Sequence, residues 1–134
     1  EISKKINFDK IAAIESRGFI FSAPLSYIVN KPIVLLRKEN KLPADKYSVA
    51  FKLEYGSATL EMHKDSINET EKVLIIDDLI ATGGTSKAAT EVIELAGGKV
   101  SGLIFVINLF DLGGQDKLKQ KSFFSESVIN FPGH

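Results

Sequence analysis

The chain has 134 residues, a length that suits one domain with a buried core of its own. Its 17 basic and 17 acidic side chains cancel, so no overall field attracts it to nucleic acid or to a membrane surface. No apolar run approaches the roughly 20 residues of a membrane-spanning helix, and the absence of cysteine excludes disulfides. With no signal-peptide pattern present, we expect a cytoplasmic protein.

The first part of the chain predicts a strand, a helix and a second strand. Residues 1–7 resemble the end of a helix; a strand at Lys10–Glu15, a helix at Phe19–Val29 and a buried strand at Ile33–Leu36 follow. Pro24 lies early in the predicted helix, where its missing N–H costs least. Because such a connection returns in the same direction, we expect the two strands to be parallel neighbours.

The next part predicts a hairpin. Polar and apolar residues alternate over Tyr47–Glu54 and again over Ser57–Met62, with a turn at Tyr55-Gly56 between them. An antiparallel hairpin interrupts the parallel pattern, and we expect the region Glu39–Met62 to act as a lid.

The second half of the chain predicts the centre of the sheet. Val73–Ile76 is an uninterrupted apolar run, which is typical of a strand covered on both faces. The expected elements after it are a helix at Ser86–Leu95, a strand at Val100–Leu109, a short helix at Gly113–Gln120 and an edge strand at Ser122–Val128. The fold class is therefore α/β: a mostly parallel twisted sheet flanked by helices on both faces, with an antiparallel hairpin lid.

Two carboxylates and a small-residue loop follow the central strand. Asp77 and Asp78 come first, and then the loop Ala-Thr-Gly-Gly-Thr at 81–85 presents backbone N–H groups at the start of a helix. This arrangement favours phosphate binding. Paired acids would repel the phosphate unless they accept hydrogen bonds from ribose hydroxyls, each worth roughly 1.5–3 kcal/mol when charge-assisted. The stretch predicts a ribose 5-phosphate site; the alternative is a strand, turn and helix with solvated acids.

Basic side chains follow the first two strands, and each has two open interpretations. Arg17 either grips a phosphate with two parallel hydrogen bonds or is an ordinary surface arginine. Arg37, Lys38 and Lys41 either belong to a solvated loop or offset the negative charge of a pyrophosphate leaving group.

The predicted lid carries one candidate for acid–base chemistry. Glu54 is either a charge on the solvated face of the hairpin or a general acid or base that lid closure brings to the site. Tyr55 lies in the same loop and could order it. Glu61 and His63 are nearby, and we assign His63 no role. The glycine loop is not a Walker loop, because no Gly-Lys-Thr or Gly-Lys-Ser follows.

Residues 73–86, VLIIDDLIATGGTS, closely resemble the diphosphoribosyl-binding motif of the purine and pyrimidine phosphoribosyltransferases. The blocks that resemble the adenine-specific branch of this type I family are ESRGFIF at 15–21, RKENKLP at 37–43, LEYGSATLEMHKD at 53–65 and FVINLFDLGGQDKL at 105–118. They run through nearly the whole chain, so we expect residues 1–134 to form one phosphoribosyltransferase domain. The family's amino-terminal hood segment is expected to be missing, and Glu15 stands where the family more often has Asp.

The resemblance implies purine salvage: transfer of the phosphoribosyl group from phosphoribosyl pyrophosphate to adenine, giving AMP and pyrophosphate. It also implies magnesium, bound mainly through phosphoribosyl pyrophosphate, a homodimer, and a cis peptide around Ser16–Arg17. Glu54 would be the catalytic acid–base residue. The resemblance implies that substrate contacts come from Asp77 and Asp78 at the ribose, from Ala81, Thr82, Gly83, Gly84 and Thr85 at the 5′-phosphate, from Arg17, Arg37, Lys38 and Lys41 at the pyrophosphate, from Leu79 at the purine ring and from Tyr55 in the mobile loop.

Two rival functions stay open. One is a phosphoribosyltransferase for another base, such as xanthine, hypoxanthine or a pyrimidine. The other is a non-catalytic regulator of the same fold that binds phosphoribosyl pyrophosphate without turning it over. The neutral composition argues against a nucleic-acid-binding regulator.

Overall fold

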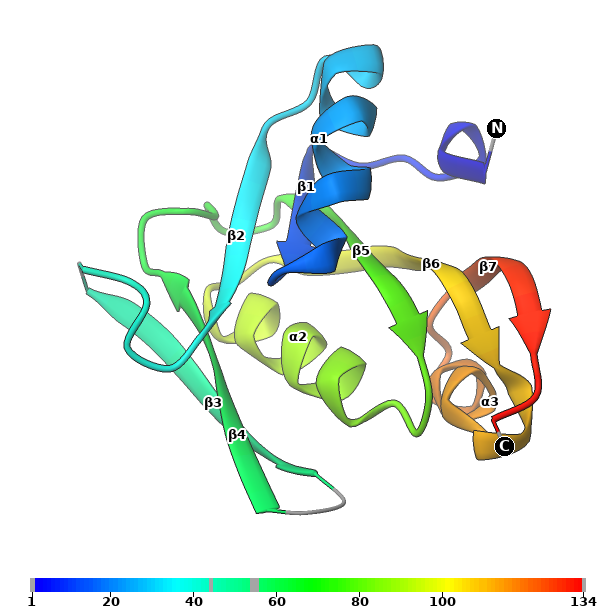
Figure 1. Ribbon diagram of the computed structural model, residues 1–134. Coiled ribbons are helices and arrows are strands. Elements are labelled where there is room, and N and C mark those ends of the chain that lie inside the picture. The colour runs from blue at the N-terminus through cyan, green and yellow to red at the C-terminus, as the bar shows by residue number, and fades with distance from the viewer. Residues whose placement is uncertain (1, 44, 54–55, 134) are drawn as a thin grey trace.

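The computed structural model describes residues 2–43, 45–53 and 56–133 (Figure 1). The strands found there are β1 (Lys10–Ile14), β2 (Ile33–Lys38), β3 (Lys46–Leu53), β4 (Gly56–His63), β5 (Lys72–Ile80), β6 (Lys99–Leu109) and β7 (Ser125–Phe131). The helices are α1 (Arg17–Val29), α2 (Gly84–Leu95) and α3 (Gly114–Gln120), with short 3₁₀ turns η1 (Ile2–Lys5) and η2 (Phe110–Leu112).

The strands form one sheet in the order β3-β4-β2-β1-β5-β6-β7. β1 pairs in parallel with β2 and β5, and β6 pairs in parallel with β5 and β7. β4 runs antiparallel to both β2 and β3, so the hairpin extends the sheet at one edge. The predicted α/β class, the parallel centre and the antiparallel hairpin are confirmed.

Helices cover both faces of the sheet, as the apolar run at the centre of β5 predicted. Val73–Ile76 are at most 4% exposed, and their side chains alternate between two clusters. Val73 and Ile75 belong to a cluster that contains Ala89 and Val92 of α2. Leu74 and Ile76 belong to the other cluster, against which Leu25 and Val29 of α1 pack. Each such burial stabilises the fold by about 1.5–3 kcal/mol, so β5 is anchored on both faces of the sheet.

The observed elements extend further toward the loops than the sequence indicated. β2 continues to Lys38 and β5 to Ile80, while α1 already begins at Arg17 and α2 at Gly84. β5 is longer because β6 pairs with it to the end, matching Leu79 with Ile107 and Ile80 with Asn108. The acid pair therefore lies inside a strand and not after it. The amino-terminal segment is a 3₁₀ turn, and the last strand lies three residues later than expected.

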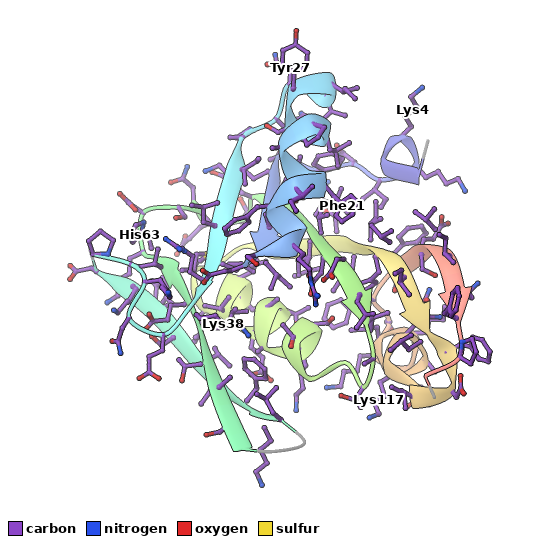
Figure 2. All side chains as sticks on the ribbon, viewed as in Figure 1. Lys4, Phe21, Tyr27, Lys38, His63 and Lys117 are labelled. Atoms are coloured by element: carbon purple, nitrogen blue, oxygen red, sulfur yellow. The ribbon has the colours of Figure 1, made fainter. Side chains whose placement is uncertain are left out.

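The outer surface of α1 carries apolar side chains that no other element of the described structure covers. Ile20, Tyr27 and Ile28 are 67%, 89% and 77% exposed. Tyr27 extends away from the sheet at the end of α1 (Figure 2). Among the described helices, none combines the length and apolar character that a membrane crossing demands.

Candidate functional site

A cleft of about 570 Å³ opens at the carboxyl ends of β1, β2 and β5. In α/β sheets this edge is where ligands bind. Half of the sequence-predicted site residues meet in it, since the lining residues are Ile14, Glu15, Ser16, Arg17, Lys38, Lys41, Asp77, Asp78, Leu79 and Thr85. The cleft thus combines three carboxylates, those of Glu15, Asp77 and Asp78, with three cations.

The two aspartates of the cleft have different surroundings. Asp77 is buried, and its Oδ1 accepts a hydrogen bond of 2.8 Å from the Asp78 backbone N–H. Asp78 is more open, and its Oδ2 lies 2.7 Å from the Nε of Arg17. The Arg17 side chain is 72% exposed, so this ion pair is worth only about 0.2–1 kcal/mol. A ligand can therefore replace this ion pair with its own contacts to Arg17 and Asp78 at little cost.

Burial and the neighbouring carboxylate change the acidity of Asp77. Burial comes first, and a hydrogen bond and the negative charge from Asp78 add to it, raising the pKa of Asp77 from 3.8 to about 7. The hydrogen bond from the Asp78 N–H and the charge of Arg17 lower the pKa of Asp77 but do not cancel these effects. Asp77 can therefore hold or release a proton near neutral pH.

Gly18 allows the start of α1 to approach the acid pair. A Cβ at this position would lie 2.9 Å from the Ile76 carbonyl oxygen and 3.5 Å from Asp77 Oδ1. Any side chain would push α1 away from β5 and carry Arg17 with it. Sequence reasoning assigned Gly18 no role, although it lies in the ESRGFIF block.

The basic residues after β2 separate into two groups. Lys38 and Lys41 line the cleft, whereas Arg37 is not among the lining residues and its Nη2 lies 3.0 Å from Glu15 Oε2. Glu15 also accepts a 2.8 Å hydrogen bond from the Lys38 backbone N–H. Burial opposes ionisation of Glu15, but these bonds outweigh it and lower its pKa. Arg37 and Glu15 together hold the end of β2 beside the cis peptide bond Glu15–Ser16.

The small-residue loop turns directly into α2. Gly83 caps the helix with φ 90°, a left-handed conformation that glycine adopts without strain. A second cavity, of about 130 Å³, lies in front of the loop and is lined by residues 79–86 together with Lys52 and Leu53 of β3. Leu79 and Thr85 line both cavities, so the acid pair and the loop face adjoining cavities.

Strand β3 supplies a cation that sequence reasoning missed. Lys52 lines the cavity at the loop, and its carbonyl oxygen would be 3.4 Å from a Cβ on Gly84. The only sequence signal for it was its place on the predicted lid, two residues before Glu54. Glu54 and Tyr55 themselves lie outside the described residues.

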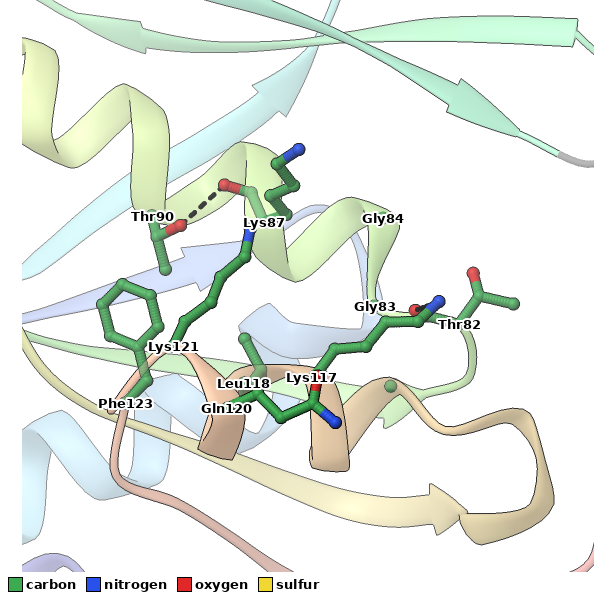
Figure 3. Close-up of a pocket in the computed structure, with 11 residues that line it drawn as sticks. Thr82, Gly83, Gly84, Lys87, Thr90, Lys117, Leu118, Gln120, Lys121 and Phe123 are labelled. Carbon is green, nitrogen blue, oxygen red and sulfur yellow. Dashed lines mark hydrogen bonds between the residues drawn. The ribbon is translucent and has the colours of Figure 1, made fainter.

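The back of the loop faces α3. A cavity of about 350 Å³ separates α2 from α3 and is lined by Lys87, Lys117 and Lys121 among others (Figure 3). Lys117 Nζ donates a hydrogen bond of 3.2 Å to the Thr82 carbonyl oxygen. Sequence reasoning did not single out Lys117, which lies in the FVINLFDLGGQDKL block.

No group of three or more His, Cys, Asp or Glu side chains suited to a metal ion occurs within residues 2–43, 45–53 and 56–133. Among the carboxylates of the cleft, Glu15 is already bonded to Arg37 and to the Lys38 N–H, which leaves those of Asp77 and Asp78 as candidate oxygen donors. Mg²⁺ is commonly held by one or two carboxylates together with substrate phosphates.

Comparison with known sequences identifies one domain family. The pattern of the phosphoribosyl transferase domain matches residues 1–132. An adenine phosphoribosyltransferase of Pelagibacter ubique is 56% identical over 134 residues, which are 100% of this chain and 77% of that protein. One of Butyrivibrio fibrisolvens is 54% identical over 114 residues, 85% of this chain and 63% of that protein.

Solved structures resemble this chain over the same extent. The adenine phosphoribosyltransferase of Thermoanaerobacter pseudethanolicus matches with a TM-score of 0.91 and 44% identity, over 96% of this chain and 74% of that one. The Giardia lamblia enzyme in complex with 9-deazaadenine matches with a TM-score of 0.90 and 35% identity, over 97% and 74% of the two chains.

Proposed function

The chain belongs to the phosphoribosyltransferase family, and from this premise we propose that it makes AMP and pyrophosphate from adenine and phosphoribosyl pyrophosphate. The observation that carries the proposal is that the cavity at the acid pair and the cavity at the glycine loop adjoin, with Leu79 and Thr85 lining both. One ligand with a vicinal diol and a 5′-phosphate can reach both.

The proposed substrate position follows from the charges in the cleft. The ribose hydroxyls donate hydrogen bonds to Asp77 and Asp78, and the 5′-phosphate accepts them from the N–H groups of the loop at the start of α2. The pyrophosphate then faces Arg17, Lys38 and Lys41, the three cations of the cleft. Leu79 lies between the two cavities, where an apolar side chain can pack against the purine ring.

The reaction breaks the bond between the anomeric carbon and the pyrophosphate oxygen, and the electron pair leaves with pyrophosphate. The adenine nitrogen that attacks this carbon supplies the electron pair of the new bond and loses its proton. Positive charge develops on the sugar while negative charge grows on the leaving group, where Arg17, Lys38 and Lys41 stabilise it. We assign the proton transfer at the base to Glu54.

We propose that magnesium accompanies the substrate. Asp77 and Asp78 are hard oxygen donors inside the cleft and fit an ion held by carboxylates and phosphates together. When bound, the ion neutralises part of the charge on the departing pyrophosphate.

We also propose a homodimer in the cytoplasm. The exposed apolar stripe of α1, formed by Ile20, Tyr27 and Ile28, supports a self-association surface, because burying it in a second copy removes that area from water. Phosphoribosyl pyrophosphate, one of the two proposed substrates, is highly charged and does not cross membranes unaided, which supports a cytoplasmic location.

A panel of bases tests the proposed activity. The protein is incubated with phosphoribosyl pyrophosphate, magnesium and adenine, hypoxanthine, guanine, xanthine or uracil in turn, and the nucleotide formed is quantified by chromatography. We expect AMP to form fastest. Preference for another base would transfer the assignment to another branch of the family. Binding of phosphoribosyl pyrophosphate without any nucleotide would instead indicate the non-catalytic regulator.

A further inference from the structure

The segment that follows β6 contacts the small-residue loop at 81–85 from behind, on the side opposite to the cavity that Lys52 and Leu53 line. The Gly114 N–H donates a 2.9 Å hydrogen bond to the Ala81 carbonyl oxygen. Lys117, one turn further along α3, donates to the next carbonyl of the loop, that of Thr82, at 3.2 Å (Figure 3). Two successive loop carbonyls are thus bonded to α3.

These two bonds determine where the loop N–H groups point. In a trans peptide plane the C=O and the N–H point in opposite directions, and the cis bond of the described chain lies elsewhere, at Glu15–Ser16. The Ala81 carbonyl shares its plane with the Thr82 N–H, and the Thr82 carbonyl shares its plane with the Gly83 N–H. When α3 holds both carbonyls at the back, both N–H groups are directed away from α3, toward the side where Lys52 and Leu53 close the front cavity.

The packing between the two glycine segments leaves no room for a side chain. A Cβ on Gly114 would overlap the Ala81 carbonyl oxygen and lie 2.8 Å from Ile80 Cγ1 and 2.9 Å from the Gly83 nitrogen. A Cβ on Gly83 would in turn lie 3.3 Å from Gly114 Cα. The main chains of the two segments are in direct contact, so a shift of α3 would move the loop with it.

We propose that Gly114 and Lys117 are positioning residues that hold the loop in its phosphate-binding conformation by fixing the carbonyls of Ala81 and Thr82. This inference rests on the proposed function, which identifies the ligand of the loop as a ribose 5-phosphate group. It gives a role to the second half of the FVINLFDLGGQDKL block, which the chemistry of the cleft does not require.

The test compares Lys117→Met with Lys119→Met, a matched control on the same helix whose exposed side chain does not line the cavity behind the loop. Binding of ribose 5-phosphate and of pyrophosphate is measured separately by titration calorimetry. Losing one hydrogen bond to the loop should weaken ribose 5-phosphate binding about three- to tenfold in Lys117→Met. Pyrophosphate binding should stay unchanged, and the control should match the wild type for both ligands.

Gly114→Ala is the stronger perturbation, because the loop itself must move, and we expect a loss of about 100-fold in ribose 5-phosphate affinity. If this variant unfolds, Lys117→Met decides alone. Wild-type ribose 5-phosphate affinity in Lys117→Met, or an equal loss for pyrophosphate, overturns the proposal. A wild-type protein that binds ribose 5-phosphate but forms no AMP contradicts the proposed function only, while a selective loss in Lys117→Met would still support the positioning role.

Discussion

Asp77→Asn tests the cost of keeping a buried carboxylate at the ribose site. The fold raises the pKa of Asp77 from 3.8 to about 7, so between these values the folded protein binds more protons than the unfolded chain. The free energy of unfolding then falls as the pH rises from about 4 to about 7. One pH unit corresponds to ~1.4 kcal/mol, and the full cost of ionised Asp77 is at most about 4 kcal/mol.

An asparagine at this position resembles the protonated acid. Its oxygen can accept the hydrogen bond from the Asp78 N–H, its amide can donate to the Asp78 carboxylate, and it never carries a charge. We therefore expect Asp77→Asn to gain stability relative to the wild type as the pH rises, by up to about 4 kcal/mol between pH 4 and pH 8. The same variant should bind phosphoribosyl pyrophosphate more weakly, because the ribose loses a charged acceptor.

Urea unfolding at pH 4 and at pH 8 measures the effect, with titration calorimetry for the ligand. Asp116→Asn, which removes an exposed carboxylate from α3, serves as the control and should show the same stability difference from the wild type at both pH values. If the gain of Asp77→Asn is also equal at both pH values, the buried carboxylate does not carry the cost described here. Unchanged ligand affinity would contradict its role at the ribose.

Three further outcomes are expected. Glu54→Gln should lower kcat roughly 10²–10⁴-fold in a steady-state assay if Glu54 transfers the base proton, and unchanged turnover would remove that role. Gly18→Ala should lower the free energy of unfolding by about 1–3 kcal/mol, because its Cβ meets the Ile76 carbonyl, and should raise the KM for phosphoribosyl pyrophosphate; thermal unfolding and kinetics that match the wild type would refute this. Ile20→Lys with Ile28→Lys should give a monomer in analytical ultracentrifugation, and a dimer that survives both changes would place the interface elsewhere.

The centre of the fold could be predicted because its signals are local. Four consecutive apolar residues at Val73–Ile76 require cover on both faces, and the clusters on the two sides of β5 provide it. The glycine loop and the following helix are likewise a short-range pattern. The strand end could not be predicted, because the pairing of Ile80 with Asn108 of β6 extends β5 beyond the acid pair.

The side-chain partners in the site were beyond sequence reasoning for a related reason. Arg37 looked like its neighbours Lys38 and Lys41, yet only the folded chain brings Glu15 within 3.0 Å of it. Lys117 lies 35 positions from the loop carbonyl that it contacts. Such pairs depend on how distant elements pack, whereas the acid pair and its loop are adjacent in the chain.

The ion pair between Arg17 and Asp78 has a consequence for which ligands the free protein accepts. A molecule with only a diphosphate end would draw Arg17 away and leave Asp78 without a counter-charge. A sugar without a diphosphate would draw Asp78 away and leave the Arg17 guanidinium without a counter-charge. Only a donor that presents both a diphosphate and ribose hydroxyls compensates each charge, so separating the pair favours such a donor over either fragment by about 0.2–1 kcal/mol, the worth of the exposed pair.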